Sequence, residues 1–122
     1  MYTLLPQTYP ATAPQLLLQT STGAELINYS QLVRVEAISN YSKLYFSNGK
    51  TLVVAKVLAW FEARLAEQGF LRLHRSHLVN RAFIVRFVQQ RQQVAILYNQ
   101  EMVAVAKRKK QAVRSALCRT AA

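Results

Sequence analysis

The segment Leu71–Phe87, with the sequence LRLHRSHLVNRAFIVRF, alternates β-forming apolar residues with polar ones, and it contains four arginines, two histidines and no acidic residue. Alternation of apolar and polar residues over a short run is typical of half-buried strands. The pattern predicts two strands, at residues 70–74 and 82–88, separated by a short turn. Because arginine is seldom buried unless it is paired, the polar side of this segment is expected to meet a partner outside the core.

Strands are also predicted on both sides of this segment. Four further stretches share a β-rich composition bounded by turn-forming residues, namely residues 15–27, 31–39, 40–55 and 91–106. In the third, Asn48-Gly49 predicts a type I′ hairpin turn, in which both central residues have positive φ. In the fourth, the turn is expected near Asn99-Gln100.

One stretch, residues 56–69, has the period of a helix. Leu58, Phe61 and Leu65 recur at three- and four-residue spacing, and Gly69 suits a left-handed C-terminal cap. No Ser, Thr, Asp or Asn stands immediately before the run, so the sequence does not fix where the helix begins. An amphipathic helix of this length is expected to cover one face of the sheet.

These elements predict a mainly β fold, with antiparallel strands and one covering α-helix. Residues 15–117 form the expected domain, and residues 107–117 of it predict a weak terminal helix. Residues 1–14 carry three prolines and no charge, which predicts a loose arm. Residues 118–122 are expected to be a tail. The hydrophobic content of 52% argues against a disordered chain.

The charge of the chain is large and unevenly distributed. The net charge is +11, with 16 Lys and Arg against five Glu and no Asp. Residues 1–70 have a net charge of +1, whereas residues 71–122 have a net charge of +10 and a single acid, Glu101. This composition favours a polyanionic partner that meets the C-terminal half.

Several classes of function find no support in the sequence. The five glutamates are scattered singly and no glycine-rich phosphate loop is present, so neither paired-carboxylate catalysis nor nucleotide binding is expected. Cys118 is the only cysteine. His74 and His77 stand three residues apart, which on one strand would send their side chains to opposite faces. In a turn they could share a metal ion, but no carboxylate or thiol lies nearby to complete the set of ligands. We therefore expect no enzymatic activity, metal, cofactor or small-molecule substrate.

The run Lys107 to Lys110 is a candidate nucleic-acid contact, since no acid balances it and further arginines stand upstream, namely Arg72, Arg75, Arg81, Arg86 and Arg91. Several cations on one face supply the counterion release that dominates affinity for DNA. Arg75 and Arg108 are the candidates for bidentate hydrogen bonds to guanine, because a guanidinium matches its O6 and N7 atoms. The lysines suit phosphates.

The stretch FLRLHRSHLVN resembles the signature of the LytTR family of bacterial DNA-binding domains, Phe-x-Arg-x-His-Arg-Ser-aromatic-x-Val-Asn. Upstream, VEAISNYSKLYFSNGKTL is similar to the Glu-Ala-x-x-Asn-Tyr segment and hairpin of that family. The sequence VAVAKRKKQAV lies where the family has a basic element. The resemblance covers about residues 15–117.

The resemblance implies an elongated antiparallel β fold whose loops enter successive major grooves and bend the DNA. It implies three contact regions, made by Asn40, Tyr41, Ser42 and Lys43, by Arg75, and by Lys107 and Arg108, with Lys109 and Lys110 continuing the last one. For His74 and Asn80 we expect structural roles, with the histidine held by the backbone and the asparagine organising a turn.

The chain departs from the family pattern at two positions, since His77 replaces the usual Tyr or Phe and Ala106 stands where a Ser is common. The fourteen residues before the domain are too few for a receiver domain. We therefore expect either a stand-alone regulator or a piece of a longer chain.

The combined prediction is a bacterial, cytoplasmic transcriptional regulator that binds double-stranded DNA, with two copies on tandem sites and no contact with a membrane. The alternative is an RNA-binding or ribosome-associated basic β-protein, in which Tyr41 and Tyr45 stack on single-stranded bases. A third reading is a protein–protein adaptor that captures its partner with residues 1–14.

Overall fold

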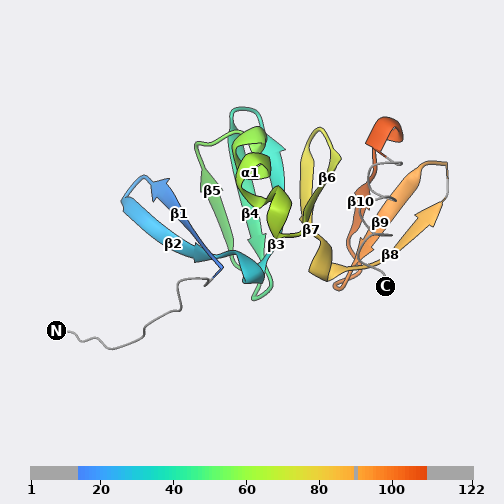
Figure 1. The fold of residues 1–122 in the computed structure, drawn as a ribbon, viewed down its shortest axis with the longest axis horizontal. Coiled ribbons are helices and arrows are strands. Elements are labelled where there is room, and N and C mark those ends of the chain that lie inside the picture. The colour runs from blue at the N-terminus through green and yellow to red at the C-terminus, as the bar shows by residue number, and fades with distance from the viewer. Residues whose placement is uncertain (1–13, 90, 110–122) are drawn as a thin grey trace.

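The computed structural model describes residues 14–89 and 91–109. Within this part the chain forms three antiparallel sheets, one α-helix and four short 3₁₀ turns. The sheets lie side by side along an elongated molecule, with the helix over the central sheet (Figure 1). The predicted mainly β fold with one covering helix is therefore confirmed.

The central sheet has five strands in the order β5-β4-β3-β7-β6. Their bounds are Leu32–Ile38 for β3, Tyr41–Phe46 for β4, Thr51–Val54 for β5, Phe70–His74 for β6 and His77–Asn80 for β7. The pairing of β3 with β7 joins the N-terminal and C-terminal halves of the chain.

A smaller sheet flanks each side of the central one. A two-stranded hairpin precedes it, made of β1 (Gln15–Thr20) and β2 (Gly23–Asn28). A three-stranded sheet follows it in the order β10-β9-β8, made of β8 (Ile84–Gln89), β9 (Gln93–Leu97) and β10 (Met102–Ala104).

Helix α1 (Leu58–Leu65) packs on the central sheet through the three residues that its period predicted. Leu58, Phe61 and Leu65 are all buried in one cluster, together with core residues of β1, β2 and the central sheet. No side chain caps its first turn. At its other end the 3₁₀ turn η2 (Ala66–Gln68) leads into Gly69, which has the left-handed conformation (φ 93°) expected for a C-terminal cap.

A second apolar cluster joins the central sheet to the three-stranded one. Val33, Leu73 and Val79 of the central sheet pack against four residues of the neighbouring strands, namely Ala95, Leu97, Val103 and Val105. The two sheets therefore share a core, and their relative position depends on it.

Three local predictions were wrong. The segment between the strands at 70–74 and 82–88 is not a short turn, because it contains β7 and the 3₁₀ turn η3 (Arg81–Phe83). Asn48 does not have positive φ, since Gly49 alone is left-handed in that loop (φ 89°). The amides of Phe46 and Gly49 donate to the carbonyls of Lys50 and Phe46 at 2.9 and 3.0 Å, which is the three-residue loop with a glycine bulge rather than a type I′ turn.

The third wrong prediction concerns the two histidines. His74 ends β6 and His77 begins β7, so they are cross-strand partners with ring centroids 5.5 Å apart. The expectation of opposite faces failed because it placed both residues on one strand. The described residues contain no group of three His, Cys, Asp or Glu side chains arranged to hold a metal ion.

The remaining expectations concern the chain ends. Of the predicted helix at 107–117, the described part is the 3₁₀ turn η4 (Lys107–Lys109). The predicted arm, apart from Pro14, and the predicted tail lie outside the described residues, so the boundaries drawn at 15 and 117 stay predictions. No helix in the described part of the chain is long and apolar enough to cross a membrane.

Candidate DNA interface

The two-residue turn between β3 and β4 carries the first predicted contact region. Ser39 has a φ of 57°, a left-handed conformation that is unfavourable for a residue with a side chain. This turn leaves Asn40 and Tyr41 exposed at the end of the sheet, with Tyr41 half accessible to solvent. Both residues are therefore placed where a large partner can reach them.

The other two residues of this region behave differently. Ser42 is completely buried, and its hydroxyl donates to the carbonyl oxygen of Lys56 at 2.6 Å. Its side chain is therefore turned into the core, and its predicted contact with DNA stays a prediction. Strand alternation places Lys43 on the opposite face, where its ammonium lies 5.1 Å from the ring centroid of Tyr45. Lys43 is half-buried and keeps its charge at the surface.

The β6–β7 turn presents Arg75, whose side chain is exposed and has no partner among the described residues. The backbone of this turn is held by Arg72. The Nε atom of Arg72 donates to the carbonyl of His74 at 2.9 Å, and its Nη2 atom donates to the carbonyl of Arg75 at 2.7 Å. Its Nη1 atom donates to Glu62 on α1 at 2.5 Å. One guanidinium therefore ties the turn to the helix.

His74 supports the same turn from the other side, because its Nδ1 atom accepts a hydrogen bond from the amide of Ser76 at 3.2 Å. Asn80 caps η3 by accepting from the amide of Ala82 at 3.0 Å, and it donates to the carbonyl of Leu32 at 2.9 Å. These contacts match the structural roles expected for the histidine and the asparagine.

The third region, η4, follows β10 directly and lies against the β6–β7 turn. The amide of Ala106 donates to the carbonyl of Leu73 at 2.8 Å, which fixes the start of η4 beside β6. Lys107 and Arg108 are exposed and Lys109 is half-buried. Lys110 lies outside the described residues.

A hollow of about 220 Å³ connects the second and third regions. It is lined by Arg72, His74, Arg75, Ala106, Arg108 and Lys109. None of these residues is acidic. Since Arg72 is already bound to Glu62 and to the turn, the groups left to attract an anion are Arg75, Arg108 and Lys109.

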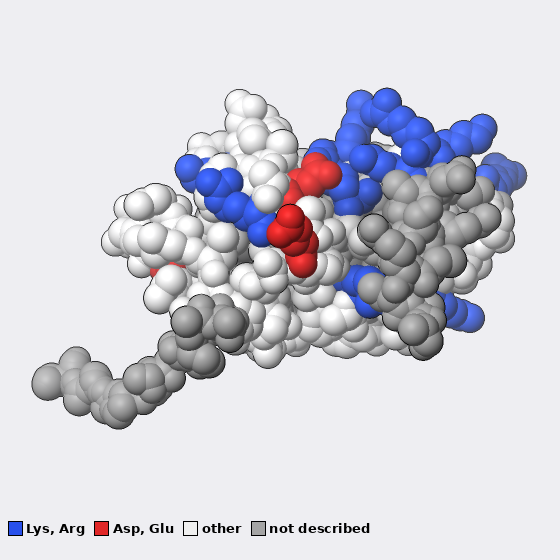
Figure 2. Space-filling model, in the orientation of Figure 1, with Lys and Arg blue, Asp and Glu red and all other residues white. Residues whose placement is uncertain are grey.

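The β3–β4 turn, the β6–β7 turn and η4 all lie along one long edge of the molecule (Figure 1). We call this edge, formed by residues 39–40, 75–76 and 107–109, the basic rim. Figure 2 shows Lys and Arg side chains gathered along it above the C-terminal half, whereas the most prominent acidic side chains in this view lie over the middle of the face. Three segments that are distant in the sequence therefore meet on one edge.

Not all of the upstream arginines belong to this rim. Arg72 uses its donors inside the protein, and Arg81 lies in η3, which Figure 1 places at the opposite edge. Arg91 lines a second hollow together with Lys107 and His74. In the sequence these arginines look like one basic set, because a cation that binds the protein's own backbone cannot be distinguished there from one that faces solvent.

His77 occupies the position where the family usually has an aromatic residue. Burial lowers its pKa from the ordinary value of 6.5; the charge of Glu36 opposes this shift, and the charges of His74 and Arg34 add to it. Its Nδ1 atom is buried without a hydrogen-bond partner among the described residues. The ring therefore replaces an aromatic side chain in packing and is favoured in its neutral form.

Comparison with known proteins agrees with this geometry. The family model for the LytTr DNA-binding domain matches residues 23–118. Among solved structures, the LytTr DNA-binding domain of a response regulator from Bacillus cereus is similar, with a TM-score of 0.73 and 24% sequence identity. The match covers 85% of this chain and 96% of that one. No curated protein matches the chain.

The structural match shows that the fold is shared, and the family match extends over most of the chain. This family binds double-stranded DNA in transcription regulation and is not a catalytic family. The chain belongs to the LytTR family of DNA-binding domains.

Proposed function

We propose that this protein is a sequence-specific transcriptional regulator whose basic rim enters successive major grooves of double-stranded DNA and bends it. The observation that carries the proposal is the meeting of Arg75, Arg108 and Lys109 around one hollow that contains no acid. Two exposed guanidinium groups on short, backbone-held turns have the shape and chemistry to read guanine edges.

The members of the rim take different roles in this proposal. Arg75 and Arg108 read bases, whereas Lys107, Lys109 and Lys110 neutralise phosphates and fix the position of the domain on the duplex. Asn40 and Tyr41, at the β3–β4 turn, extend the contact to a second groove, and Lys43 follows them on β4. Bending is part of the proposal, because a bent duplex gains contacts with elements spread along the edge that repay the cost of its deformation.

The geometry favours duplex DNA over single-stranded RNA. Of the two tyrosines suited to stacking on bases, Tyr45 is already engaged, since its hydroxyl donates to Glu36 at 2.8 Å and the guanidinium of Arg34 lies 3.8 Å from its ring centroid. Of these two, Tyr41 is left free to stack, and one aromatic on this edge is a poor platform for a run of bases.

Selection of bound duplexes from a random pool at physiological salt tests the proposal, followed by titration of the selected site. Arg75→Ala and Arg108→Ala should each weaken specific binding by about 1–3 kcal/mol and relax the sequence preference at one position. Tyr41→Ala should have a smaller effect. Arg86→Ala, at an exposed position on β8, is the matched control for loss of one charge.

The proposal fails if no motif is enriched, or if Tyr41→Ala weakens binding more than Arg108→Ala while both variants remain folded. A repeated motif in the selected duplexes would support two copies on tandem sites. Gel mobility of circularly permuted fragments measures the bend. A cytoplasmic location, where bacterial DNA lies, is part of the proposal, and so is the lack of a small-molecule substrate.

A further inference from the structure

The elements of the basic rim belong to two different sheets. The β3–β4 and β6–β7 turns are ends of the central five-stranded sheet, whereas η4 follows β10 of the three-stranded sheet. The distance and angle between the β3–β4 turn and η4 therefore depend on how the two sheets are joined.

Near the rim, the joint between the described parts of the two sheets consists of apolar packing and a backbone hydrogen bond. Leu73 and Val79 pack against Val103 and Val105, and the amide of Ala106 bonds to the carbonyl of Leu73. Apolar packing holds the sheets together, but it is not directional. A second, directional contact farther from the rim is needed to fix the angle between them.

That contact lies at the β9–β10 turn. The Nε atom of Arg34 on β3 donates to Glu101 at 3.1 Å, and Arg34 is also 3.7 Å from Glu36. Arg34 is also held in place independently of Glu101, because its guanidinium stacks on Tyr45, whose hydroxyl donates a hydrogen bond to Glu36. Its side chain is only 12% exposed, so the pair is partly shielded from water.

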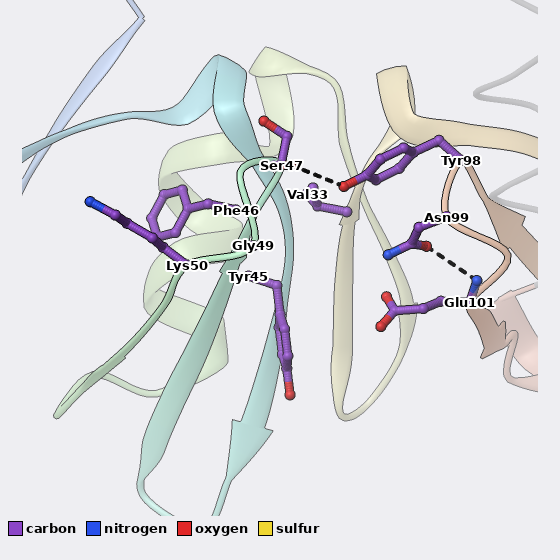
Figure 3. A pocket seen from close by; sticks show the side chains of 9 residues that line it. All are labelled: Val33, Tyr45, Phe46, Ser47, Gly49, Lys50, Tyr98, Asn99 and Glu101. Carbon is purple, nitrogen blue, oxygen red and sulfur yellow. Dashed lines mark hydrogen bonds between the residues drawn. The ribbon is translucent and has the colours of Figure 1, made fainter.

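Figure 3 shows the same joint from close by. The Tyr98 ring and the Glu101 side chain on the β9–β10 side face Tyr45 and Val33 of the central sheet across a cleft. The cleft has a volume of about 200 Å³. The hydroxyl of Tyr98 donates to the carbonyl of Ser47 at 3.4 Å, which is a long hydrogen bond. The cleft separates the β4–β5 loop from the β9–β10 turn. Because side chains do not fill it, polar contacts set how closely the loop and the turn approach each other.

The charge distribution points to the same contact. Glu101 is the only acid among residues 71–122, which carry a net charge of +10. An acid in a surface that binds a polyanion weakens that binding. This one faces an arginine of the other sheet, at the opposite end of β10 from η4.

We propose that the Arg34–Glu101 pair is a positioning contact that sets the angle between the two sheets, and thereby the number of base pairs between the sequences read by η4 and by the β3–β4 turn. The inference rests on the proposed function. Neither residue touches the DNA. Their effect is a specificity for spacing, since each added base pair moves the second element by about 3.4 Å along the duplex and rotates it by roughly a tenth of a turn.

The test uses Glu101→Gln, which keeps the size of the side chain and removes its charge. Glu25→Gln, at an exposed position on β2, is the control for the same change in net charge. Each protein is titrated against the selected site and against versions with one base pair inserted or deleted between the two elements. We expect wild type and Glu25→Gln to lose about tenfold in affinity per step, as for a mismatched base pair. Glu101→Gln should lose no more than about threefold, because the amide keeps an acceptor but loses the charge that holds Arg34, and the weaker contact lets the joint adapt to both lengths.

A second measurement reads the joint without DNA. Spin labels on cysteines introduced at Thr51 of β5 and Arg86 of β8, in a chain carrying Cys118→Ser, report the distance between the two sheets. Glu101→Gln should broaden the distance distribution and Glu25→Gln should leave it unchanged. The inference is overturned if Glu101→Gln keeps the wild-type spacing preference or the wild-type distance distribution. Failure of wild type to select any site would instead refute the proposed function.

Discussion

Arg72 is the residue whose replacement best tests how the rim is held. In the sequence it is one of several arginines that could neutralise phosphates, but in the structure its guanidinium donates to the carbonyls of His74 and Arg75 and to Glu62. Arg72→Met removes all three hydrogen bonds and keeps most of the side-chain length. If Arg72 acts through the turn, the variant should lose more specific affinity than the loss of one charge explains.

The magnitude follows from the partners. Each of the two bonds to carbonyls contributes about 0.5–1.5 kcal/mol. The ion pair with Glu62 adds no more than about 1 kcal/mol, because the Glu62 side chain is 39% exposed and water screens it. We expect a loss of about 2 kcal/mol in the free energy of unfolding, and a fall of roughly tenfold in specific DNA affinity as Arg75 loses its fixed position.

The assays are urea denaturation and titration of the selected duplex, with Arg86→Met as the control for charge. Arg86 is exposed on β8 and has no hydrogen bond or ion pair among the described residues. Arg72→Lys keeps the charge but cannot place three donors in one plane, so it should recover only part of the affinity. The reasoning fails if Arg72→Met and Arg86→Met weaken specific binding equally while both proteins stay folded.

Three further predictions concern single positions. Gln100→Gly should raise the free energy of unfolding by about 1 kcal/mol, measured by urea denaturation, because Gln100 has a φ of 74° that glycine adopts without strain; an unchanged midpoint would contradict this. Ser42→Ala should cost about 1–3 kcal/mol of stability, measured by urea denaturation, because it leaves the carbonyl of Lys56 without its side-chain donor. The affinity of the folded variant for the selected duplex should equal that of wild type, and a weaker affinity would show that Ser42 contacts DNA. His77→Phe should flatten the dependence of stability on pH. The pKa of His77 is lower in the folded protein than in the unfolded one, so its contribution to stability is complete above about pH 6.5 and is lost as the pH falls toward the folded pKa; thermal melts of the two proteins from pH 7.5 to pH 5 should diverge only below about 6.5.

Much of the fold could be predicted because its signals are local. The spacing of Leu58, Phe61 and Leu65 predicted the helix, and the glycine at 69 predicted its end. Most strand bounds followed from runs of alternating residues. The misses have different causes. Strand β7 was overlooked because only Leu78 and Val79 of its four residues are apolar, which is too short a run to indicate a strand. The loop at Asn48-Gly49 has a bulge that depends on the register between β4 and β5.

The candidate site was predictable in outline and not in its details. The resemblance to the family predicted three contact regions, and the described parts of all three lie on one edge. Ser42 was included among the contacts, but strand alternation, once the register is known, turns its side chain into the core. Arg72 and Arg75 look alike in the sequence. Only the folded turn shows that one donates to backbone carbonyls and that the other faces solvent.

The sequence by itself determined the class of fold, the excess of positive charge and its concentration in the C-terminal half, because composition and period are properties of neighbouring residues. The tertiary structure decided which cations lie on one rim, which of them are engaged inside the protein, and that Glu101 faces Arg34 across the joint between two sheets. The physical reason is that these relations depend on the pairing of β3 with β7 and on the packing of the second apolar cluster. Both bring together residues that are far apart along the chain, and a local sequence pattern does not indicate which distant residues will be in contact.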